Sequence, residues 1–326
     1  MKIAIIGSKG FDTLEFHLKD EFEFQKNEVK IFDLKSSVLH KKIDSALNLF
    51  SQKYVELINK SVLHEILEYN PDLVIGTYRH IHPLIVKGVK KNKIKIIHVN
   101  PDAITTFQNQ QIFVEPYDLY FTKDKFISSF MRDKMSLNAF TYNEAFNSRY
   151  HSSSIIDYKT AEEEINIDVL TFGNLYPYRN RMVKQLLDKN IDIKMFGHKT
   201  KYFPTYLNDC FQNRGIYGEE KAKKLSGSKI VFNNFHYAEI ESVNNKFFEI
   251  NGSGAFQICD YKPILHDLIP IDPKLVSFNN MNEAEKLIKH YLNNPEERYE
   301  IRSVMQEHFL KNYTYNNLVN HILSCV

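Results

Sequence analysis

The sequence predicts an α/β protein built from two facing, doubly wound parallel-sheet domains. Three observations predict this fold class. Short apolar runs alternate with helix-like segments, the alternation breaks once near the middle of the chain, and 326 residues suit two domains of ordinary size. Buried parallel strands form continuous apolar runs because helices cover both faces of their sheet. We therefore expect ligands at the carboxyl ends of the strands, in a cleft between the two sheets.

The first half opens with a strand, a tight turn and a helix. The run at 2–6 ends at Gly7-Ser8-Lys9-Gly10, which lacks the full dinucleotide fingerprint and is too short for a P-loop. Gly7 is therefore expected to form a turn that leaves room at the cleft. Further strands are expected at 28–34, 72–76, 95–99, 117–121 and 138–142, with helices at about 40–69, from Pro83 and at 125–134. Residues 1–155 are assigned to this first, Rossmann-like domain.

The polar stretch 147–165, with its Ser and Glu triplets, indicates a link between domains, after which the alternation restarts. Strands are expected at 167–172, 192–196, 229–233, 255–259 and 275–278, and helices at about 179–189, 218–226, 244–251, 281–293 and 295–310. Residues 156–310 are assigned to the second domain. Apolar residues at helical spacing predict that a last helix, at 311–326, packs back onto the first domain.

Composition and charge narrow the function classes. The chain has 42 basic and 40 acidic residues, a balance that argues against a nucleic-acid partner. The lysines of 87–95 indicate a solvated helix face, with a surface that rests on anionic lipid as the alternative. No window approaches the ~20 apolar residues of a membrane span, and the N-terminus lacks a signal-peptide pattern. We expect a cytoplasmic protein, with the inner face of the membrane as the alternative location.

The stretch 241–257 carries the strongest chemical signal. Glu241 and Glu249 are separated by seven residues, and Gly252 and Gly254 follow before the next apolar run. A helix at 244–251 would present its first backbone N–H groups to an anion such as a diphosphate. Glu249 could then accept hydrogen bonds from two hydroxyls of a ribose, and Glu241 would face a sugar. A solvated helix face is the alternative interpretation, since helices carry carboxylates at many spacings.

This stretch resembles the E-x7-E motif of retaining GT-B glycosyltransferases, and its sequence up to Asp260 resembles the CgeB-like glycosyltransferases. Lys246 stands where that family usually has Arg, so the charge is kept but the bidentate geometry is lost. Residues 168–179 resemble the family's strand, glycine, loop and arginine, and 195–197 its strand that ends in a glycine. The resemblance covers about 167–315, and 117–150 more loosely.

The resemblance implies transfer of a sugar from a nucleotide diphosphate sugar, such as a UDP-sugar, to a hydroxyl of a glycan, lipid-linked saccharide or protein in polysaccharide biosynthesis, with retention of configuration. The donor-binding residues that it implies are Gly173, Arg179, Gly197, Asn244, Asn245, Lys246 and Glu249. A nucleotide-sugar epimerase or hydrolase on the same scaffold, and a non-catalytic nucleotide-sugar-binding module, are the alternatives.

Polar residues near the ends of predicted strands supply the remaining candidates. Glu241, His98 and Asp102 are the catalytic candidates, and Gly7, His80 and His82 are expected to line the acceptor side. Neither an Asp-x-Asp pair nor a His/carboxylate set with ligand spacing is present, so we expect no metal site and no cofactor beyond the nucleotide-sugar co-substrate.

Overall fold

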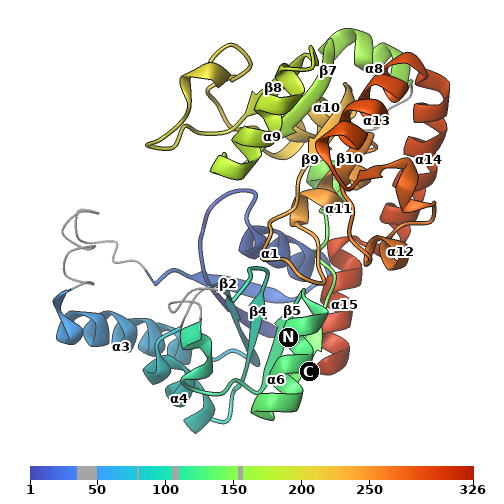
Figure 1. The fold of residues 1–326 in the computed structure, drawn as a ribbon. Coiled ribbons are helices and arrows are strands. Elements are labelled where there is room, and N and C mark those ends of the chain that lie inside the picture. The colour runs from blue at the N-terminus through green and yellow to red at the C-terminus, as the bar shows by residue number, and fades with distance from the viewer. Residues whose placement is uncertain (35–49, 79–80, 105–109, 153–156) are drawn as a thin grey trace. The chain divides into compact units, whose positions relative to one another are not determined.

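The computed structural model describes residues 1–34, 50–78, 81–104, 110–152 and 157–326 (Figure 1). The chain forms two compact units. Unit 1 contains Met1–Asn143 together with Val319–Val326, and unit 2 contains Glu144–Leu318. Both boundaries expected from the sequence, after residues 155 and 310, therefore fall within unit 2.

Unit 1 is built on a six-stranded parallel sheet with the order β2-β1-β3-β4-β5-β6. Its strands are β1 (Lys2–Ile6), β2 (Glu28–Phe32), β3 (Leu73–Thr77), β4 (Lys95–Asn100), β5 (Leu119–Thr122) and β6 (Ala139–Thr141). Ile5 of β1 lies opposite Ile31 of the edge strand β2 and Ile75 of β3, and Ile5 and Ile75 are fully buried in the core. The order reverses at β1, as in doubly wound folds.

The helices of unit 1 are α1 (Leu14–Phe24), α3 (Gln52–Tyr69), α4 (Pro83–Lys91) and α6 (Lys125–Met135), with a 3₁₀ turn η1 (Gln111–Phe113). Helices α3 and α4 lie side by side (Figure 1). Side-chain caps fix where helices begin: Thr13 Oγ1 accepts from the Phe16 N–H at the start of α1, and Asp124 caps α6. Of the helix predicted at 40–69, residues 40–49 lie outside the described residues.

The last residues of the chain pack within unit 1. They form the end of α15 (Tyr315–Cys325), where Val319 and Ile322 are buried. Asn320 Oδ1 accepts a hydrogen bond of 3.2 Å from Gln25 Nε2, and His321 Nε2 lies 3.1 Å from the Thr141 carbonyl oxygen. Unit 1 thus includes residues from both ends of the chain.

Unit 2 is built on a five-stranded parallel sheet with the order β11-β10-β9-β7-β8. Its strands are β7 (Ile167–Phe172), β8 (Ile193–Phe196), β9 (Ser228–Asn233), β10 (Gln257–Asp260) and β11 (Ser277–Phe278). Its helices are α7 (Ser148–His151), α8 (Tyr158–Ile165), α9 (Pro177–Leu187), α10 (Gly218–Ser226), α11 (Asn245–Gly252), α12 (Leu265–Leu268), α13 (Met281–Asn293) and α14 (Pro295–Asn312), with 3₁₀ turns η2 (Thr205–Leu207) and η3 (Pro273–Leu275). Strand order reverses at β7, which has β8 on one side and β9 on the other.

The polar stretch expected to link the domains belongs to unit 2 and contains helices α7 and α8. Its acidic triplet does not simply face solvent, because Glu162 is buried between two buried arginines. Arg298 Nη2 lies 2.5 Å from Glu162 Oε2, and Arg302 Nη1 lies 2.7 Å from Glu162 Oε1. These partners come from α14, more than a hundred residues further along the chain. The ion-paired cluster therefore fixes α8 against α14.

The core of unit 2 is rich in aromatic side chains. Phe247 and Phe248 of α11 pack against Phe309 of α14, with ring centroids 5.5 and 5.9 Å apart. Gly252 lies so close to the Phe146 ring that an added Cβ would come within 2.4 Å of it. Helix α11 is thereby held rigidly between the sheet and α14.

None of the helices in the described ranges has the length and apolar character that a membrane span requires.

Candidate functional site

Two cationic side chains converge at the carboxyl end of β7. Arg179 Nη1 and Lys246 Nζ both donate to the carbonyl oxygen of Phe172, at 3.1 and 3.0 Å. Gly173 follows with a φ of +95°, and a Cβ there would lie 3.5 Å from Lys246 Nζ. The structure therefore brings together three of the predicted donor-binding residues, one from the turn after β7, one from the first turn of α9 and one from the first turn of α11.

Arg179 is positioned by a set of carbonyl oxygens. The side chain is 3% exposed; its Nε donates to Asn234 Oδ1 at 2.7 Å, and its Nη1 also donates to the Asn174 carbonyl oxygen at 2.6 Å. No hydrogen bond is made by Nη2 to any described residue. Burial lowers the pKa of the guanidinium, although such a group stays protonated in proteins. The charge is thus held rigidly, with one nitrogen available to a ligand.

The ammonium group of Lys246 is destabilised by its surroundings. Desolvation by burial, together with the positive charge of Arg179, lowers the pKa of Lys246 well below its ordinary value. Two like charges beside one carbonyl oxygen are only partly compensated by that oxygen. An anion placed here would relieve the repulsion, so the pair could hold an anion such as a phosphate group.

The turns after β8 and β9 close around this cationic pair. Gly197 follows β8, and a Cβ added to it would lie 2.4 Å from the Gly173 carbonyl oxygen, so a side chain is excluded. Asn244 caps α11: its Oδ1 accepts from the Phe247 N–H at 3.1 Å, and its Nδ2 donates to Asn233 Oδ1 at 3.1 Å. The first turn of α11 is thereby tied to the end of β9.

Glu249 lies in a buried polar cluster rather than on a solvated helix face. It is 5% exposed, and its Oε1 accepts from Lys221 Nζ at 3.0 Å and from Asn245 Nδ2 at 2.9 Å. His151 Nδ1 is 4.0 Å from the same oxygen. Among the described residues nothing donates to Oε2, so this oxygen is available to hydroxyl groups of a ligand.

Two residues that act on this site were missed from the sequence. Lys221 is only 4% exposed, but its surroundings in the sequence, Glu219 to Lys224, are typical of a solvated helix face. Asp260 ends β10 and accepts from the Phe235 N–H, and burial raises the pKa of its carboxyl to about 6. Its position at a strand end is a weak signal that many polar residues share, and the sequence offers none for Lys221.

An aromatic group lies beside Arg179, in the loops after β7 and β9. Tyr176 and Tyr178 stack with ring centroids 5.6 Å apart, and His236 stacks on Tyr237 at 4.4 Å. The two stacks meet edge-to-face, with Tyr178 and His236 5.8 Å apart. Tyr237 is largely exposed. These rings offer a flat apolar wall next to the cationic pair.

Two candidates of unit 1 have structural roles. His98 is 0% exposed in the interior of β4, with its ring centroid 5.0 Å from that of Tyr117, so it is a core residue and the predicted catalytic role is not supported. A Cβ on Gly7 would lie 2.3 Å from Glu15 Oε1, which accepts from the Ser8 N–H at 2.9 Å. Gly7 therefore makes room for a buried carboxylate.

The remaining candidates come from both units. His82 caps α4, with its Nδ1 accepting from the Leu84 N–H at 3.2 Å. Asp102 is exposed after β4, and Glu241 is exposed in the loop before α11. His80 lies outside the described residues. The strand ends of unit 1 thus add no catalytic constellation within the part of the chain that the structure describes.

Comparison with solved structures identifies the fold of the chain. The chain superimposes on a glycosyltransferase from Rickettsia africae ESF-5 with a TM-score of 0.69 and 12% identity, covering 99% of this chain and 97% of the other. For HepE of Anabaena in complex with UDP and glucose, the TM-score is 0.69 at 11% identity, covering all of both chains. This chain has the GT-B glycosyltransferase fold. Sucrose-phosphate synthase of Thermosynechococcus elongatus is similarly related, with a TM-score of 0.70, 10% identity and coverage of 99% and 97%.

The sequence matches agree with this fold. Residues 179–324 of the GT-B chain match the family described as glycosyl transferase-like. Spore protein CgeB of Bacillus subtilis (strain 168) is 24% identical over 173 residues, which make up 48% of this chain and 53% of that protein. The match thus spans about half the length of the curated relative. The resemblance predicted from the sequence, to GT-B and CgeB-like glycosyltransferases, is confirmed.

Proposed function

We propose that this chain transfers a sugar from a nucleoside diphosphate sugar to a hydroxyl group of a saccharide or lipid-linked acceptor. The observation that carries the proposal is the convergence of Arg179 and Lys246 on the Phe172 carbonyl oxygen, beside the first turn of α11. A diphosphate placed there would meet two cations and the N-terminus of a helix. The glycosyl transferase-like match over residues 179–324 contains both cationic residues.

The chemistry follows from where charge develops. When the bond between the anomeric carbon and the diphosphate oxygen breaks, the electron pair stays on the diphosphate, and the acceptor oxygen forms the new bond to that carbon. Arg179 and Lys246 would stabilise the developing charge in a desolvated site. A diphosphate oxygen on the same face would take the acceptor proton, giving retention of configuration. Retention rests on the E-x7-E resemblance of Glu241 and Glu249.

Glu249 is assigned to the ribose. Lys221 and Asn245 hold its Oε1, which leaves Oε2 to accept from a ribose hydroxyl. We assign uridine as the base because HepE was solved with UDP and with UDP-glucose, and a phage β-glucosyltransferase with UDP-glucose. Identities of 11–15% make this a statement about the fold's common ligands, to be tested directly.

The test is calorimetric titration of the full chain with UDP, UMP and uridine, followed by a transfer assay with UDP-glucose and other UDP-sugars. UDP should bind most tightly, and NMR of the product should show the donor's anomeric configuration. Equal affinity for UDP and uridine would contradict the proposal that Arg179 and Lys246 bind the diphosphate. Binding without turnover on any acceptor would favour a non-catalytic module, and sugar release or isomerisation without an acceptor would favour a hydrolase or epimerase.

We further propose that transfer needs no metal ion, because Arg179, Lys246 and the α11 N-terminus supply the positive charge next to the diphosphate. Transfer should persist in EDTA, with at most a change in the rate of product release. Loss of turnover in EDTA that magnesium or manganese restores would contradict this.

A further inference from the structure

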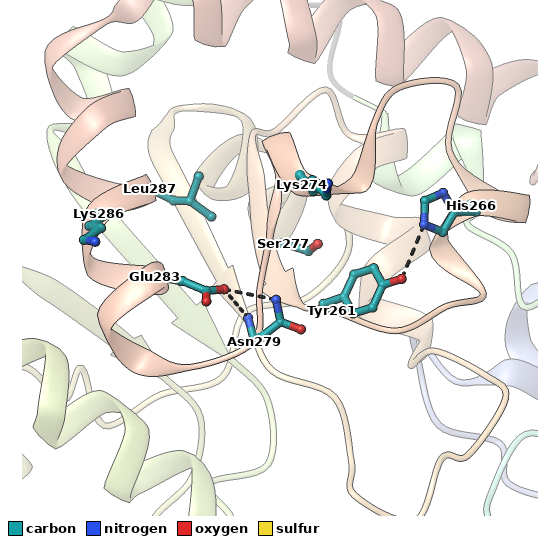
Figure 2. A pocket seen from close by; sticks show the side chains of 8 residues that line it. All are labelled: Tyr261, His266, Lys274, Ser277, Asn279, Glu283, Lys286 and Leu287. Atoms are coloured by element: carbon teal, nitrogen blue, oxygen red, sulfur yellow. Dashed lines mark hydrogen bonds between the residues drawn. The ribbon is translucent and has the colours of Figure 1, made fainter.

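A cavity lies in unit 2, apart from the residues assigned to the donor. Its volume is about 560 Å³, within the roughly 300–1,000 Å³ of small-ligand pockets. The residues that line it are Tyr261, His266, Lys274, Ser277, Asn279, Glu283, Lys286 and Leu287 (Figure 2). None of them belongs to the site around Arg179, Lys246 and Glu249.

The cavity lies at the outer strands of the sheet. Tyr261 directly follows β10 and Asn279 directly follows β11, while the candidate donor site is formed by the turns after β7, β8 and β9. All five strands are parallel, so these turns share one edge of the sheet. Tyr261 and Asn279 therefore place part of the lining at the ligand-binding edge of the sheet, next to the donor residues in strand order, whereas Lys274 precedes β11.

The charge of the lining is positive. Within the described residues, neither Lys274 nor Lys286 makes a side-chain hydrogen bond or a close ion pair. The one carboxylate of the lining, Glu283, is already engaged: its Oε2 accepts from Asn279 N at 2.8 Å and Nδ2 at 3.1 Å, and its Oε1 from Asn280 Nδ2 at 2.8 Å. The hydrogen bonds from Asn279 lower the pKa of Glu283, so it stays ionised as a local cap. The two ammonium groups remain for an incoming anion.

The rest of the lining suits a ring rather than a bare ion. The Tyr261 ring and the Leu287 side chain supply apolar surface, and the Tyr261 hydroxyl lies 3.3 Å from His266 Nε2 (Figure 2). Asn279 uses its N–H groups on Glu283, which leaves its side-chain carbonyl as an acceptor for a hydroxyl. Apolar C–H faces, hydroxyl groups and one negative charge are the features of an acidic or phosphorylated sugar.

We propose that this cavity is a binding site for an anionic sugar, a pyranose that carries a carboxylate or a phosphate. Lys274 and Lys286 lie on different sides of the cavity (Figure 2), so the negative group pairs with one of these two ammonium groups, and the ring packs on Tyr261. The site is separate from the donor site and rests on different residues. Its occupancy therefore does not depend on the glycosyl-transfer proposal being correct.

The experiment is NMR titration of the isotope-labelled full chain, saturated with UDP, with glucuronate, glucose 6-phosphate, inorganic phosphate and neutral glucose. Both anionic sugars should bind at least about tenfold more tightly than glucose, because a hydrogen bond to a charged group is worth more than a neutral one. The anionic sugar that binds more tightly shows whether the site prefers a carboxylate or a phosphate. Each should also bind more tightly than inorganic phosphate, which lacks the ring.

A double variant, Lys274→Gln with Lys286→Gln, should weaken the anionic sugars by about tenfold or more while leaving glucose unchanged. Both lysines are exposed, so the melting temperature should not move. Lys289→Gln is the matched control: it lies on the same helix α13, pairs with Glu285 at 2.7 Å and does not line the cavity. Four results would each overturn the proposal. The first two are equal binding of glucose and glucuronate, and no binding of either anionic sugar. The others are displacement of the sugars by UDP in an unsaturated sample, and an equal loss of affinity in the Lys289→Gln control.

Discussion

The strand ends of the two units differ in what their polar residues do. In unit 2, the residues predicted to bind a donor contact one another: Arg179 and Lys246 share the Phe172 carbonyl oxygen, and Gly173 and Gly197 pack together beside them. In unit 1, His98 is a core residue and His82 caps a helix. Polar residues at the strand ends thus converge on one another in unit 2, whereas in unit 1 they have structural roles.

The difference teaches which kind of sequence signal carries functional information. In unit 2 the sequence pattern combined three features: a predicted helix start, two carboxylates at a fixed spacing, and glycines that follow them. These features agree with one another on one local structure. In unit 1 the signal was single histidines near strand ends, and a buried strand accommodates a histidine without any ligand. Variants in both units can test this contrast.

The largest effect is expected from Glu249→Ala. It removes the proposed acceptor for a ribose and takes the carboxylate at 3.0 Å away from the buried Lys221 ammonium group, so the free energy of unfolding should fall by about 3–5 kcal/mol. Urea unfolding measures this loss, and calorimetry measures the accompanying loss of UDP affinity. The double variant Glu249→Leu with Lys221→Met should recover much of the stability but not the affinity. A double variant that binds UDP normally would refute the ribose assignment.

Arg179→Ala should weaken UDP binding by about 1.5–3 kcal/mol, the range for hydrogen bonds to charged groups. Uridine should be nearly unaffected, because it lacks the diphosphate. Arg181→Ala is the control, since that residue is exposed on the same helix and has no partner among the described residues. A similar loss in both variants would point to general electrostatics rather than to a positioned guanidinium.

The sequence predicted the strands well and the buried polar partners poorly. The apolar runs 2–6 and 167–172 coincide with β1 and β7, because buried parallel strands form continuous apolar runs. By contrast, Glu162 and Lys221 occur among charged residues that are typical of solvent-facing helices. Their burial depends on Arg298, Arg302 and Glu249, which are distant in sequence, so no local pattern reports it.

The site was predicted in the same uneven way. The glycines after β7 and β8 and the two cationic residues were predicted because they match the motifs of GT-B and CgeB-like glycosyltransferases, and each lies in a turn or a first helical turn next to a strand end. Asn234, which holds Arg179 at 2.7 Å, and the carboxyl of Asp260 could not be ranked above other polar residues, since their roles depend on which strands become neighbours. Strand order is a property of the whole sheet.

Lys246 should make UDP affinity depend on pH. Its pKa in the free protein is lowered well below the ordinary value, and a bound diphosphate would raise it again. The affinity is therefore fully present below the lowered pKa and falls as the pH rises through it, because binding must then take up a proton. Calorimetry above about pH 7, where the terminal phosphate is already ionised, isolates this effect.

Lys246→Arg supplies the control for that titration. A guanidinium stays protonated throughout the range, so the pH dependence should flatten even if the affinity itself changes. Proton uptake, measured by repeating the calorimetry in buffers of different ionisation enthalpy, should disappear in the same variant. An unchanged slope in Lys246→Arg would assign the titration to another group.

The smallest effect is expected in unit 1, from His82→Ala. The Nδ1 of His82 accepts from the Leu84 N–H at the start of α4, and loss of a helix cap typically costs about 0.5–2 kcal/mol. A lower melting temperature with unchanged UDP affinity is therefore expected, and His82→Asn, which can also cap a helix, should restore the melting temperature. If His82 lines the acceptor side, as predicted from the sequence, transfer to the acceptor should slow in both variants, whatever happens to stability. Measuring the melting temperature and the transfer rate together decides whether a strand-end histidine of unit 1 is a cap alone or also contacts the acceptor.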